Sequence, residues 1–376
     1  MEFIRLGDVA TYINGYAFKP EDRGDVGLPI IRIQDLTGNA YDLGFYDGEY
    51  PEKIEINDGD VLISWSASLG VYVWNRGKAL LNQHIFKVAF DKVEIDKNYF
   101  VYAVRQKLGE MASKTHGATM KHIIKKDFDA TLIPFPSLEE QELIATNLDK
   151  VANIIKARSE ELNKLDDLIK ARFVEMFGLL EQPAQDFPRD ILKNLCNKIT
   201  DGKHGGCTQE DGTERYFVGA REIYDDAVHY ETAPQINVEE FEKDYRRCNV
   251  EKGDFLIVNT GATIGKSAIA IDERTECTLL QKSVALLKTK RAILHPVFLK
   301  YCYVVNDKMY KVKSASAQPN LLLSKINSTE IYVPSMALQE EFVAFVDQID
   351  KSKVVVQQAL EKTQLLFDKL MQEYFG

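Results

Sequence analysis

Two long stretches of the chain carry hydrophobic residues at alternating steps of three and four. We call the line of positions with this spacing a seam. Arg158 and Arg172 interrupt the first seam, and its apolar positions are Leu148, Val151, Ile155, Leu162, Leu165, Ile169 and Met176. The second stretch keeps this spacing at Val346, Ile349, Lys353, Val356, Leu360, Thr363, Phe367, Leu370 and Tyr374. This heptad spacing predicts two long α-helices, and Ser137 with Glu140 forms a capping box before the first of them.

Neither helix can bury such a seam alone, so two packing arrangements are open. In one, the helices pair antiparallel as a coiled coil, because the segment between them is long enough to reverse the chain direction. In the other, each seam packs onto its own globular domain. We favour the helix pair because each seam persists over so long a stretch of sequence.

The chain also contains an internal duplication. Phe135–Val151 aligns without a gap with Val333–Ile349, and Phe177-Gly178 corresponds to Phe375-Gly376 at the same offset. Gly is typical of the position that ends a helix. The sequence therefore predicts two copies of one unit, each ending in a long helix.

The rest of each copy alternates short apolar runs with Gly and Asp turns, a pattern that predicts β-strands. In the first copy, the predicted strands are Leu28–Ile33, Asp60–Trp65, Val71–Trp74, Ile85–Phe90 and Thr131–Ile133. Helices are predicted at Leu6–Ile13 and Lys97–Leu108, the latter with an echo at Pro296–Tyr303. The predicted fold class is α+β, with two tandem mixed α/β domains at residues 1–136 and 179–334, each followed by a long helix at 137–178 and 335–376.

Composition is that of an ordinary globular protein, with 45% hydrophobic and 10% aromatic residues. No segment approaches the ~18 consecutive apolar residues of a membrane span. The first residues lack the features of a signal peptide, so we expect a cytoplasmic protein. All five cysteines lie in the second copy without metal-ligand spacing, which predicts small buried side chains rather than disulfides.

The formal net charge of −10 does not suggest a nucleic-acid binder, but a local basic face can decide docking. In the first copy, basic side chains gather at Lys114, His116, Lys121, His122, Lys125 and Lys126. The matching region of the second copy contains Lys308, Lys311, Lys313 and Lys325. A solvated charged surface explains these residues equally well.

Candidate catalytic motifs are incomplete. Gly261–Ser267 resembles a phosphate-binding loop, but Thr260 occupies the position of its first glycine. Pro188–Asp190 with Asp201–Lys203 loosely resembles a nuclease pattern that the first copy lacks, and the histidines are scattered. The sequence therefore favours a recognition and assembly protein over an enzyme.

Together these features resemble the specificity subunits of type I restriction–modification systems, the HsdS family. The resemblance covers essentially the whole chain, and each motif is weak alone although the ordered, repeated set is specific. The motifs that carry it are Pro136–Gln141 with the looser Pro334–Gln339, Gly59–Ile63 with Gly253–Ile257, Gly261–Gly265, and Leu80–His84.

The resemblance implies that each globular domain is a target recognition domain that reads one half of a bipartite double-stranded DNA sequence. It implies two methyltransferase (M) subunits docked at the junctions of helix and domain, joined by restriction (R) subunits, with no membrane partner. It also implies a non-catalytic chain without a cofactor of its own, because S-adenosylmethionine, ATP and Mg²⁺ belong to the partner subunits.

Gln, Asn and Arg are suited to reading base edges, whereas Lys mainly contacts phosphate. In the first copy, the candidate DNA-binding residues are Arg32, Gln34, Ser66, Gln83, His84, Lys121, His122, Lys125 and Lys126. In the second copy they are Lys203, His204, Arg221, Asn259, Thr260, Lys266, Gln281, Lys282 and Asn320. The candidate partner-binding residues, where the copies agree best, are Gln141, Glu142, Gln339 and Glu340. For each residue taken singly, a structural hydrogen bond or a surface position is an equally open interpretation.

Two rival functions remain at this point. A coiled-coil scaffold with peptide-binding domains has no DNA role, and an autonomous nuclease would cleave DNA by itself. Two unlike copies with basic loops favour DNA over a single peptide ligand. We also expect the helices, as rods of roughly 60 Å, to act as a ruler. Four inserted residues in one helix then lengthen the unread DNA spacer by roughly two base pairs.

Overall fold

The computed structural model describes residues 2–39, 42–114, 123–310 and 320–376. The chain divides into two compact units. Unit 1 comprises Met1–Ser159 and Gln358–Gly376, and unit 2 comprises Glu160–Gln357. Each long helix therefore contributes one part to unit 1 and the other part to unit 2.

Unit 1 contains two four-stranded sheets. The first is antiparallel in the order β2-β9-β6-β7, with bounds Thr11–Asn14, Ile85–Ala89, Val61–Ser64 and Gly70–Val73. The second has the order β4-β3-β8-β5, with bounds Gly44–Tyr46, Leu28–Ile31, Ala79–Leu81 and Glu55–Ile56. Strands β3 and β8 run parallel, whereas the other neighbours in this sheet are antiparallel.

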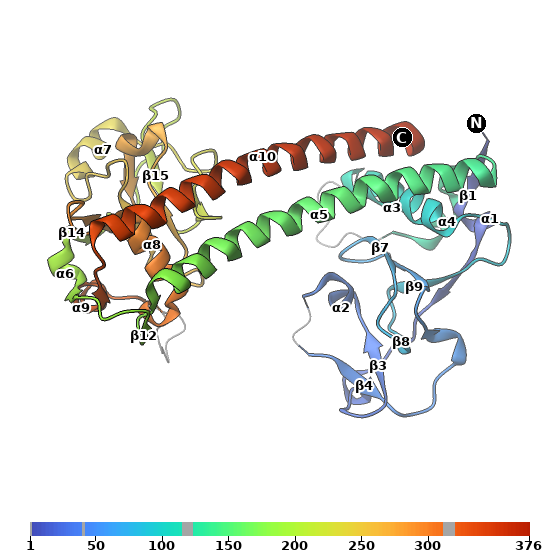
Figure 1. Ribbon diagram of the computed structural model, residues 1–376. Coiled ribbons are helices and arrows are strands. Elements are labelled where there is room, and N and C mark those ends of the chain that lie inside the picture. The colour runs from blue at the N-terminus through green and yellow to red at the C-terminus, as the bar shows by residue number, and fades with distance from the viewer. Residues whose placement is uncertain (1, 40–41, 115–122, 311–319) are drawn as a thin grey trace. The chain divides into compact units, whose positions relative to one another are not determined.

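Strand β6 is buried on both faces. In Figure 1, its neighbours β7 and β9 lie between the helices of unit 1 and the strands β3, β4 and β8 of the second sheet. Val61 and Ile63 join the core formed with the helices, whereas Leu62 packs in the core between the sheets. The remaining elements of unit 1 are β1 (Phe3–Arg5) paired with β10 (Leu132–Pro134), the helices α1 (Leu6–Val9), α2 (Ile33–Thr37), α3 (Lys97–Lys114) and α4 (Lys125–Ala130), and the 3-10 turns η1 (Pro20–Asp22) and η2 (Glu52–Ile54).

Unit 2 repeats this architecture. Its antiparallel sheet has the order β14-β21-β18-β19, with bounds Cys196–Asp201, Val284–Thr289, Phe255–Val258 and Ser267–Ile269. β15 (Tyr216–Val218) and β20 (Thr278–Leu280) form the parallel pair that corresponds to β3 and β8. β13 (Arg189–Ile191) pairs with β22 (Glu330–Tyr332) as β1 does with β10.

The other elements of unit 2 are shorter. Two hairpins are β11–β12 (Gly178–Leu179, Gln182–Pro183) and β16–β17 (Ile223–Tyr224, Ala227–Val228). The helices are α6 (Leu192–Leu195), α7 (Val238–Tyr245), α8 (Pro296–Val305) and α9 (Leu323–Ser328), with 3-10 turns η3 (Glu273–Cys277) and η4 (Asp307–Met309). The internal duplication predicted from the sequence is thus a duplication of topology.

Two of the predicted elements are wrong in part. The helix expected over Leu6–Ile13 ends at Val9, because the β-branched and aromatic residues that follow pair with β9 as strand β2. The strand expected over Leu28–Ile33 ends at Ile31. The Asp35 carboxylate accepts from the Arg32 amide at 2.8 Å, and a short helix begins there instead.

The two long helices are confirmed. α5 spans Leu138–Phe177 and α10 spans Met336–Phe375. The capping box is present, since the Glu140 amide donates to Ser137 Oγ and the Ser137 amide donates to the Glu140 carboxylate, both at 3.3 Å. Gly178 ends α5 with a φ of 72°, the left-handed conformation that glycine favours.

The helices run antiparallel, and both packing arrangements left open by the sequence occur. In unit 1, Leu148 of α5 shares a core with Phe375 of α10 and with the sheet. In unit 2, Phe173 of α5 contacts Phe342 of α10 with ring centroids 5.2 Å apart. All the predicted seam positions are buried or half-buried, so the seams pair with each other and their ends also pack onto the globular domains.

The cysteines follow the sequence expectation in part. All five are free, with Cys196, Cys248 and Cys302 buried and the other two half-buried. Burial raises the pKa of Cys196 to about 12 and that of Cys248 to about 11, which keeps both as unreactive thiols at neutral pH. No helix in the described ranges is long and apolar enough to cross a membrane.

Candidate nucleic-acid interface

In each unit, five loops meet where strands of both sheets end, and we call this place the loop junction. In unit 1 it consists of residues 15–18, 32–35, 65–69 and 82–84 and of Ile123. Five backbone hydrogen bonds of 2.8–3.2 Å bridge these loops. Their donor amide and acceptor carbonyl, in that order, are Tyr16 to Leu81, Asn82 to Ile31, Gln83 to Tyr16, Trp65 to His84, and Ile123 to Trp65.

Unit 2 builds its loop junction from residues 202–206, 219–222, 259–266, 281–283 and Asn320. The same five backbone bonds occur at 2.7–2.9 Å. Their donor amide and acceptor carbonyl, in that order, are Lys203 to Leu280, Gln281 to Val218, Lys282 to Lys203, Asn259 to Ser283, and Leu321 to Asn259. These bonds make the two junctions equivalent position by position, although the loops between them differ in length.

The side chains at equivalent positions differ between the two junctions. The pairs, with the unit 1 residue first, are Tyr16/Lys203, Arg32/Gly219, Gln34/Arg221, Trp65/Asn259, Ser66/Thr260, Asn82/Gln281, Gln83/Lys282 and His84/Ser283. Most of the residues predicted from the sequence therefore lie at one place in each unit. The sequence did not indicate Tyr16, Trp65, Asn82, Gly219 and Ser283, although Asn14-Gly15 marks the turn beside Tyr16.

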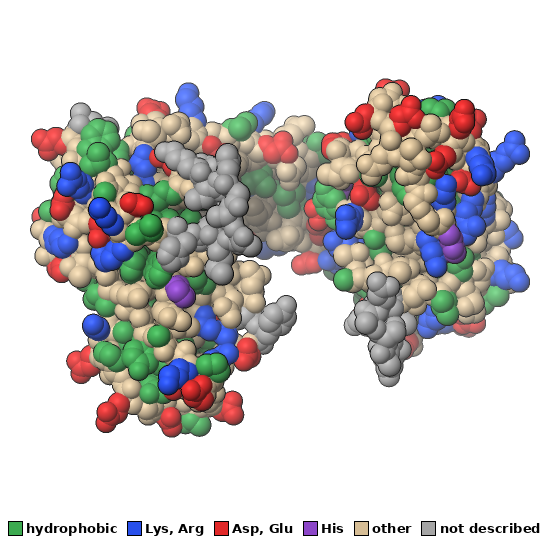
Figure 2. All heavy atoms as spheres, turned by 180° about the vertical axis from the view of Figure 1, so that it is seen from behind, with side chains coloured by type: hydrophobic (Ala, Val, Ile, Leu, Met, Phe, Trp, Pro, Cys, Tyr) green, Lys and Arg blue, Asp and Glu red, His purple; other side chains and the backbone are tan. Residues whose placement is uncertain are grey.

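The unit 2 junction encloses a cavity of about 460 Å³. Five of the predicted DNA-binding residues line it: Lys203, Thr260, Gln281, Lys282 and Asn320. Figure 2 shows Lys and Arg side chains gathered around a histidine on this unit, at the right of that view. The cavity combines amides, two hydroxyls and two cations, which is the chemistry that reads base edges and phosphates.

Acidic side chains position the basic loop at residues 202–206. Lys203 Nζ lies 2.6 Å from the Asp244 carboxylate and 3.5 Å from that of Glu240, both on α7. The hydrogen bond to Asp244 raises the pKa of Lys203, so the ammonium stays charged at neutral pH. His204 Nε2 lies 3.4 Å from Asp201, whose carboxylate also binds Arg247.

Accessibility separates the other unit 2 candidates. Arg221, Lys266 and Lys282 are exposed and free to reach a phosphate backbone. Asn259 is only 3% exposed, and its Oδ1 has no hydrogen-bond partner among the described residues. Its backbone bonds to Ser283 and Leu321 make Asn259 a structural centre of the junction rather than part of its surface.

The unit 1 junction is more aromatic. The rings of Tyr16 and Phe18 lie 5.0 Å apart, and Tyr16 is 41% exposed. His84 packs edge-on against Trp65 with centroids 4.9 Å apart, while Gln83 and the nearby Gln34 are exposed. Exposed aromatic and amide side chains side by side suit thymine methyl groups and adenine edges, respectively.

Two unit 1 candidates are committed to internal contacts. The Arg32 guanidinium donates to the Asp35 carboxylate at 3.1 Å and also binds the Asp42 carbonyl oxygen. Ser66 is 7% exposed. Both therefore shape the junction, and neither offers much side-chain surface to a ligand.

The basic stretch of unit 1 is described only in part. Lys121 and His122 lie outside the described residues. Lys125 Nζ pairs with Asp129 at 2.6 Å although the lysine side chain is 53% exposed, and the adjacent Lys126 is exposed. An exposed surface pair of this kind is weak, so both lysines remain available to phosphate.

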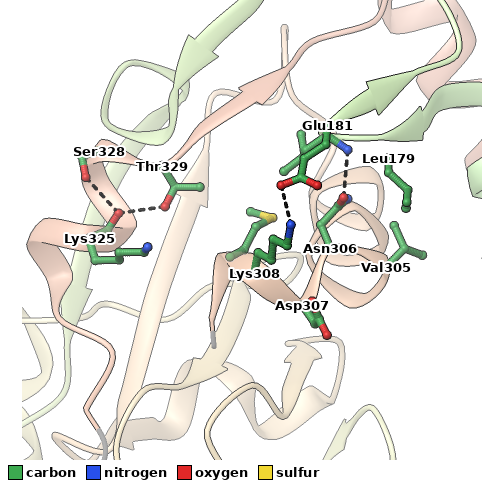
Figure 3. Close-up of a pocket in the computed structure, with 11 residues that line it drawn as sticks. Leu179, Glu181, Val305, Asn306, Asp307, Lys308, Lys325, Ser328 and Thr329 are labelled. Atoms are coloured by element: carbon green, nitrogen blue, oxygen red, sulfur yellow. Dashed lines mark hydrogen bonds and ion pairs between the residues drawn. The ribbon is translucent and has the colours of Figure 1, made fainter. Parts of the chain in front are cut away.

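The basic residues Lys308 and Lys325 of unit 2 line a different cavity, of about 340 Å³, where the chain leaves α5 (Figure 3). Lys308 Nζ pairs with Glu181 at 2.6 Å, and the Leu180 amide donates to Asn306 Oδ1 at 2.9 Å. These contacts fasten the β11 segment to η4. Lys308 thus contributes to a structural joint, whereas Lys311 and Lys313 lie outside the described residues.

The partner-binding candidates divide into two buried and two exposed residues. Gln141 Oε1 accepts from the Asp96 amide at 3.0 Å and its Nε2 donates to the Pro136 carbonyl oxygen at 2.9 Å. Gln339 makes the equivalent bonds to His295 and Pro334 at 2.8 and 2.9 Å. Both glutamines tie a helix start to its own domain, and only Glu142 and Glu340 are accessible to a partner.

The described residues contain no cluster of three or more His, Cys, Asp or Glu side chains that could hold a metal ion. The sequence profile of the type I restriction modification DNA specificity domain matches residues 1–165 and 191–363. The chain belongs to this family. Both copies of the duplication are matched, so each contains one specificity domain of the family.

Relatives of the family extend over nearly the whole chain. The EcoBI specificity subunit of a type I restriction enzyme from Escherichia coli is 26% identical over 411 residues, covering 99% of this chain and 85% of that relative. The MjaVIII specificity subunit from Methanocaldococcus jannaschii is 23% identical over 396 residues, covering 98% and 91%, respectively.

Solved structures support the same fold. The S subunit of a type I restriction–modification system from M. genitalium superposes with a TM-score of 0.53 at 16% identity, covering 100% of this chain and 96% of that one. A chain from a study of complex assembly and conformational transition of the type I system gives a TM-score of 0.59 at 18% identity, with the same coverage.

Proposed function

We propose that this chain is the DNA-specificity subunit of a type I restriction–modification system, with one target recognition domain in each unit. The observation that carries the proposal is the loop junction, which is built twice on the same backbone hydrogen bonds with different side chains. A repeated frame with unlike side chains suits a DNA target made of two unlike halves. The family match over both copies supports the same function.

The contacts with DNA divide by chemistry. Amide side chains such as Gln83 and Gln281 have the donor and acceptor pair that reads base edges, whereas exposed Lys266, Lys282 and Lys126 are suited to phosphate. The net charge of −10 makes such local cation groups necessary, since the protein as a whole repels DNA.

The chain contributes sequence choice and not catalysis. Two M subunits bind at the two equivalent helix starts, near Glu142 and Glu340, and supply methyl transfer from S-adenosylmethionine to adenine N6. R subunits add ATP- and Mg²⁺-dependent cleavage. The exposure of both glutamates on otherwise equivalent helix starts supports two equivalent docking places.

The test is co-expression with the M subunit of the same system in a methylation-free host, followed by genome-wide mapping of N6-methyladenine. We expect a single two-part motif with a fixed gap. A stable complex that leaves no new methylation would contradict the proposal and favour a protein scaffold.

A further inference from the structure

The side-chain amide of Gln281 occupies space that is open only because Gly219 has no side chain. A Cβ atom on Gly219 would lie 2.3 Å from Gln281 Oε1 and 2.5 Å from Gln281 Cδ. Gln281 Nε2 also donates a long hydrogen bond, of 3.5 Å, to the Phe217 carbonyl oxygen. The amide group of Gln281 therefore lies directly against the backbone of the loop at residues 219–222.

That loop is itself fixed from three sides. The Gly219 amide donates to the buried Glu222 carboxylate at 2.8 Å, and the Ala220 amide donates to Ser283 Oγ at 3.1 Å. The Gln281 amide donates to the Val218 carbonyl oxygen at 2.8 Å. The side chain of Gln281 is thus positioned before any ligand arrives, which lowers the entropy lost on binding.

Gln281 is also accessible. It lines the 460 Å³ cavity of the unit 2 junction, beside the cations Lys203 and Lys282. A primary amide offers two donor hydrogens and an acceptor oxygen, and the long bond to Phe217 uses one donor at most. An acceptor and a donor remain for a ligand in the cavity.

The equivalent pair in unit 1 has the opposite sizes. Arg32 replaces Gly219, and Asn82, one methylene shorter, replaces Gln281. Asn82 Oδ1 accepts from the Gln83 amide at 2.8 Å, so its acceptor is used within the loop. Unit 1 thus has a large residue, Arg32, beside the short amide of Asn82. Unit 2 has Gly219, without a side chain, beside the longer amide of Gln281. This pattern indicates that the sizes of the two side chains are adjusted to each other.

We propose that Gln281 reads an adenine in the half-site recognised by unit 2, with Gly219 as its positioning residue. The inference rests on the proposed DNA-reading function. In the major groove, adenine presents the N6 amino donor beside the N7 acceptor, which match Gln281 Oε1 and Nε2 in a two-bond pair. Guanine presents two acceptors there, so the amide discriminates between the purines.

The decisive variant is Gln281→Glu, which keeps the side-chain shape but replaces the donor by a second acceptor. We expect the requirement for adenine at one position in one half of the methylation motif to be lost. The preference at that position should move toward cytosine, whose N4 amino group suits a carboxylate. Binding of oligonucleotides with the original adenine by the complex should weaken roughly 5- to 150-fold, the loss of one two-bond pair. The other half of the motif should not change.

A second pair of variants tests positioning. Gly219→Ala should displace the Gln281 amide and weaken adenine preference, and adding Gln281→Asn should restore it because the shorter amide clears the new methyl group. Gly109→Ala is the control, since a Cβ there meets nothing within 4 Å and the residue lies in α3, outside both loop junctions.

An unchanged motif in Gln281→Glu would overturn the inference while leaving the proposed function intact. A change at a base other than adenine would overturn it as well. Failure of the wild-type complex to produce any two-part motif would instead refute the proposed function. Melting curves of each complex, measured alongside, separate a loss of base reading from a loss of folding.

Discussion

At the scale of single residues, two glycines allow the backbone approach on which the loop junctions depend. A Cβ atom on Gly15 would lie 2.1 Å from the Asn82 carbonyl oxygen, and one on Gly202 would lie 2.1 Å from that of Leu280. Because the obstructing atoms are backbone atoms in bonded loops, they cannot move aside as a flexible side chain would.

Gly202→Ala should therefore destabilise unit 2 by about 1–3 kcal/mol, the usual cost of overpacking, and should impair one half-site more than the other. Urea unfolding and half-site binding measure the two effects. Gly109→Ala, in α3 and outside the loop junctions, is the control and should lower neither stability nor half-site binding. Equal unfolding curves for both variants would contradict the close approach.

At the scale of elements, the two equivalent helices α3 and α8 begin differently. Asp96 accepts from the Tyr99 amide at 2.7 Å at the start of α3, whereas His295 Nδ1 accepts from the Val297 amide at 3.2 Å at the start of α8. A histidine can accept this bond only while Nδ1 is unprotonated. Burial lowers the pKa of His295 below its ordinary value, in agreement with that requirement.

This difference predicts a pH dependence for unit 2. Between the lowered pKa of His295 and the ordinary value of about 6.5, the unfolded state binds more protons than the folded state. The free energy of unfolding therefore rises with pH in this window and falls as the pH drops below about 6.5. His295→Asp, which copies the unit 1 cap, should reduce the loss of melting temperature between pH 7.5 and pH 5.5. The same loss in variant and wild type would show that His295 does not contribute to it.

At the scale of the whole molecule, an acidic protein must bind an acidic polymer through local cation groups. Each phosphate contact contributes about 0.9 to the slope of log affinity against log salt. Lys266→Ala with Lys282→Ala removes two exposed cations from the unit 2 junction.

The double variant should lower the magnitude of the salt slope by about 1.8 if both lysines contact phosphate. DNA binding by the complex with the M subunits, titrated over a range of salt concentrations, measures the slope. Lys308→Ala is the control, because this lysine pairs with Glu181 at a separate cavity. An unchanged slope in the double variant would exclude the phosphate contacts.

A second prediction at this scale is that the length of the two long helices sets the gap between the two halves of the DNA motif. A four-residue insertion at matched heights of α5 and α10 adds about 6 Å to the helix pair, and one base-pair step is about 3.4 Å. We expect the unread gap of the methylation motif to grow by about one or two base pairs, the smaller value applying if the helices are inclined to the DNA axis. A mapped motif with its original gap would exclude the helices as a ruler.

The sequence by itself determined the features that depend on local order along the chain. The heptad seams, the capping box at Ser137 and the duplication could be predicted because helix period and repeat spacing are properties of neighbouring residues. Most residues of the candidate interface could also be named, since the motif segments around Gln83 and Gln281 carry suitable amide chemistry.

Only the tertiary structure decided which of those residues lie together and which are available. The junction joins loops far apart in sequence through bonds such as that from Leu321 to Asn259, and loops of unequal length hide the equivalence of Trp65 and Asn259. The burial of Gln141 and Gln339, and the contact of Gly219 with Gln281, likewise arise from packing between distant segments. Local periodicity contains no information about such contacts, because they depend on how sheets and helices are stacked.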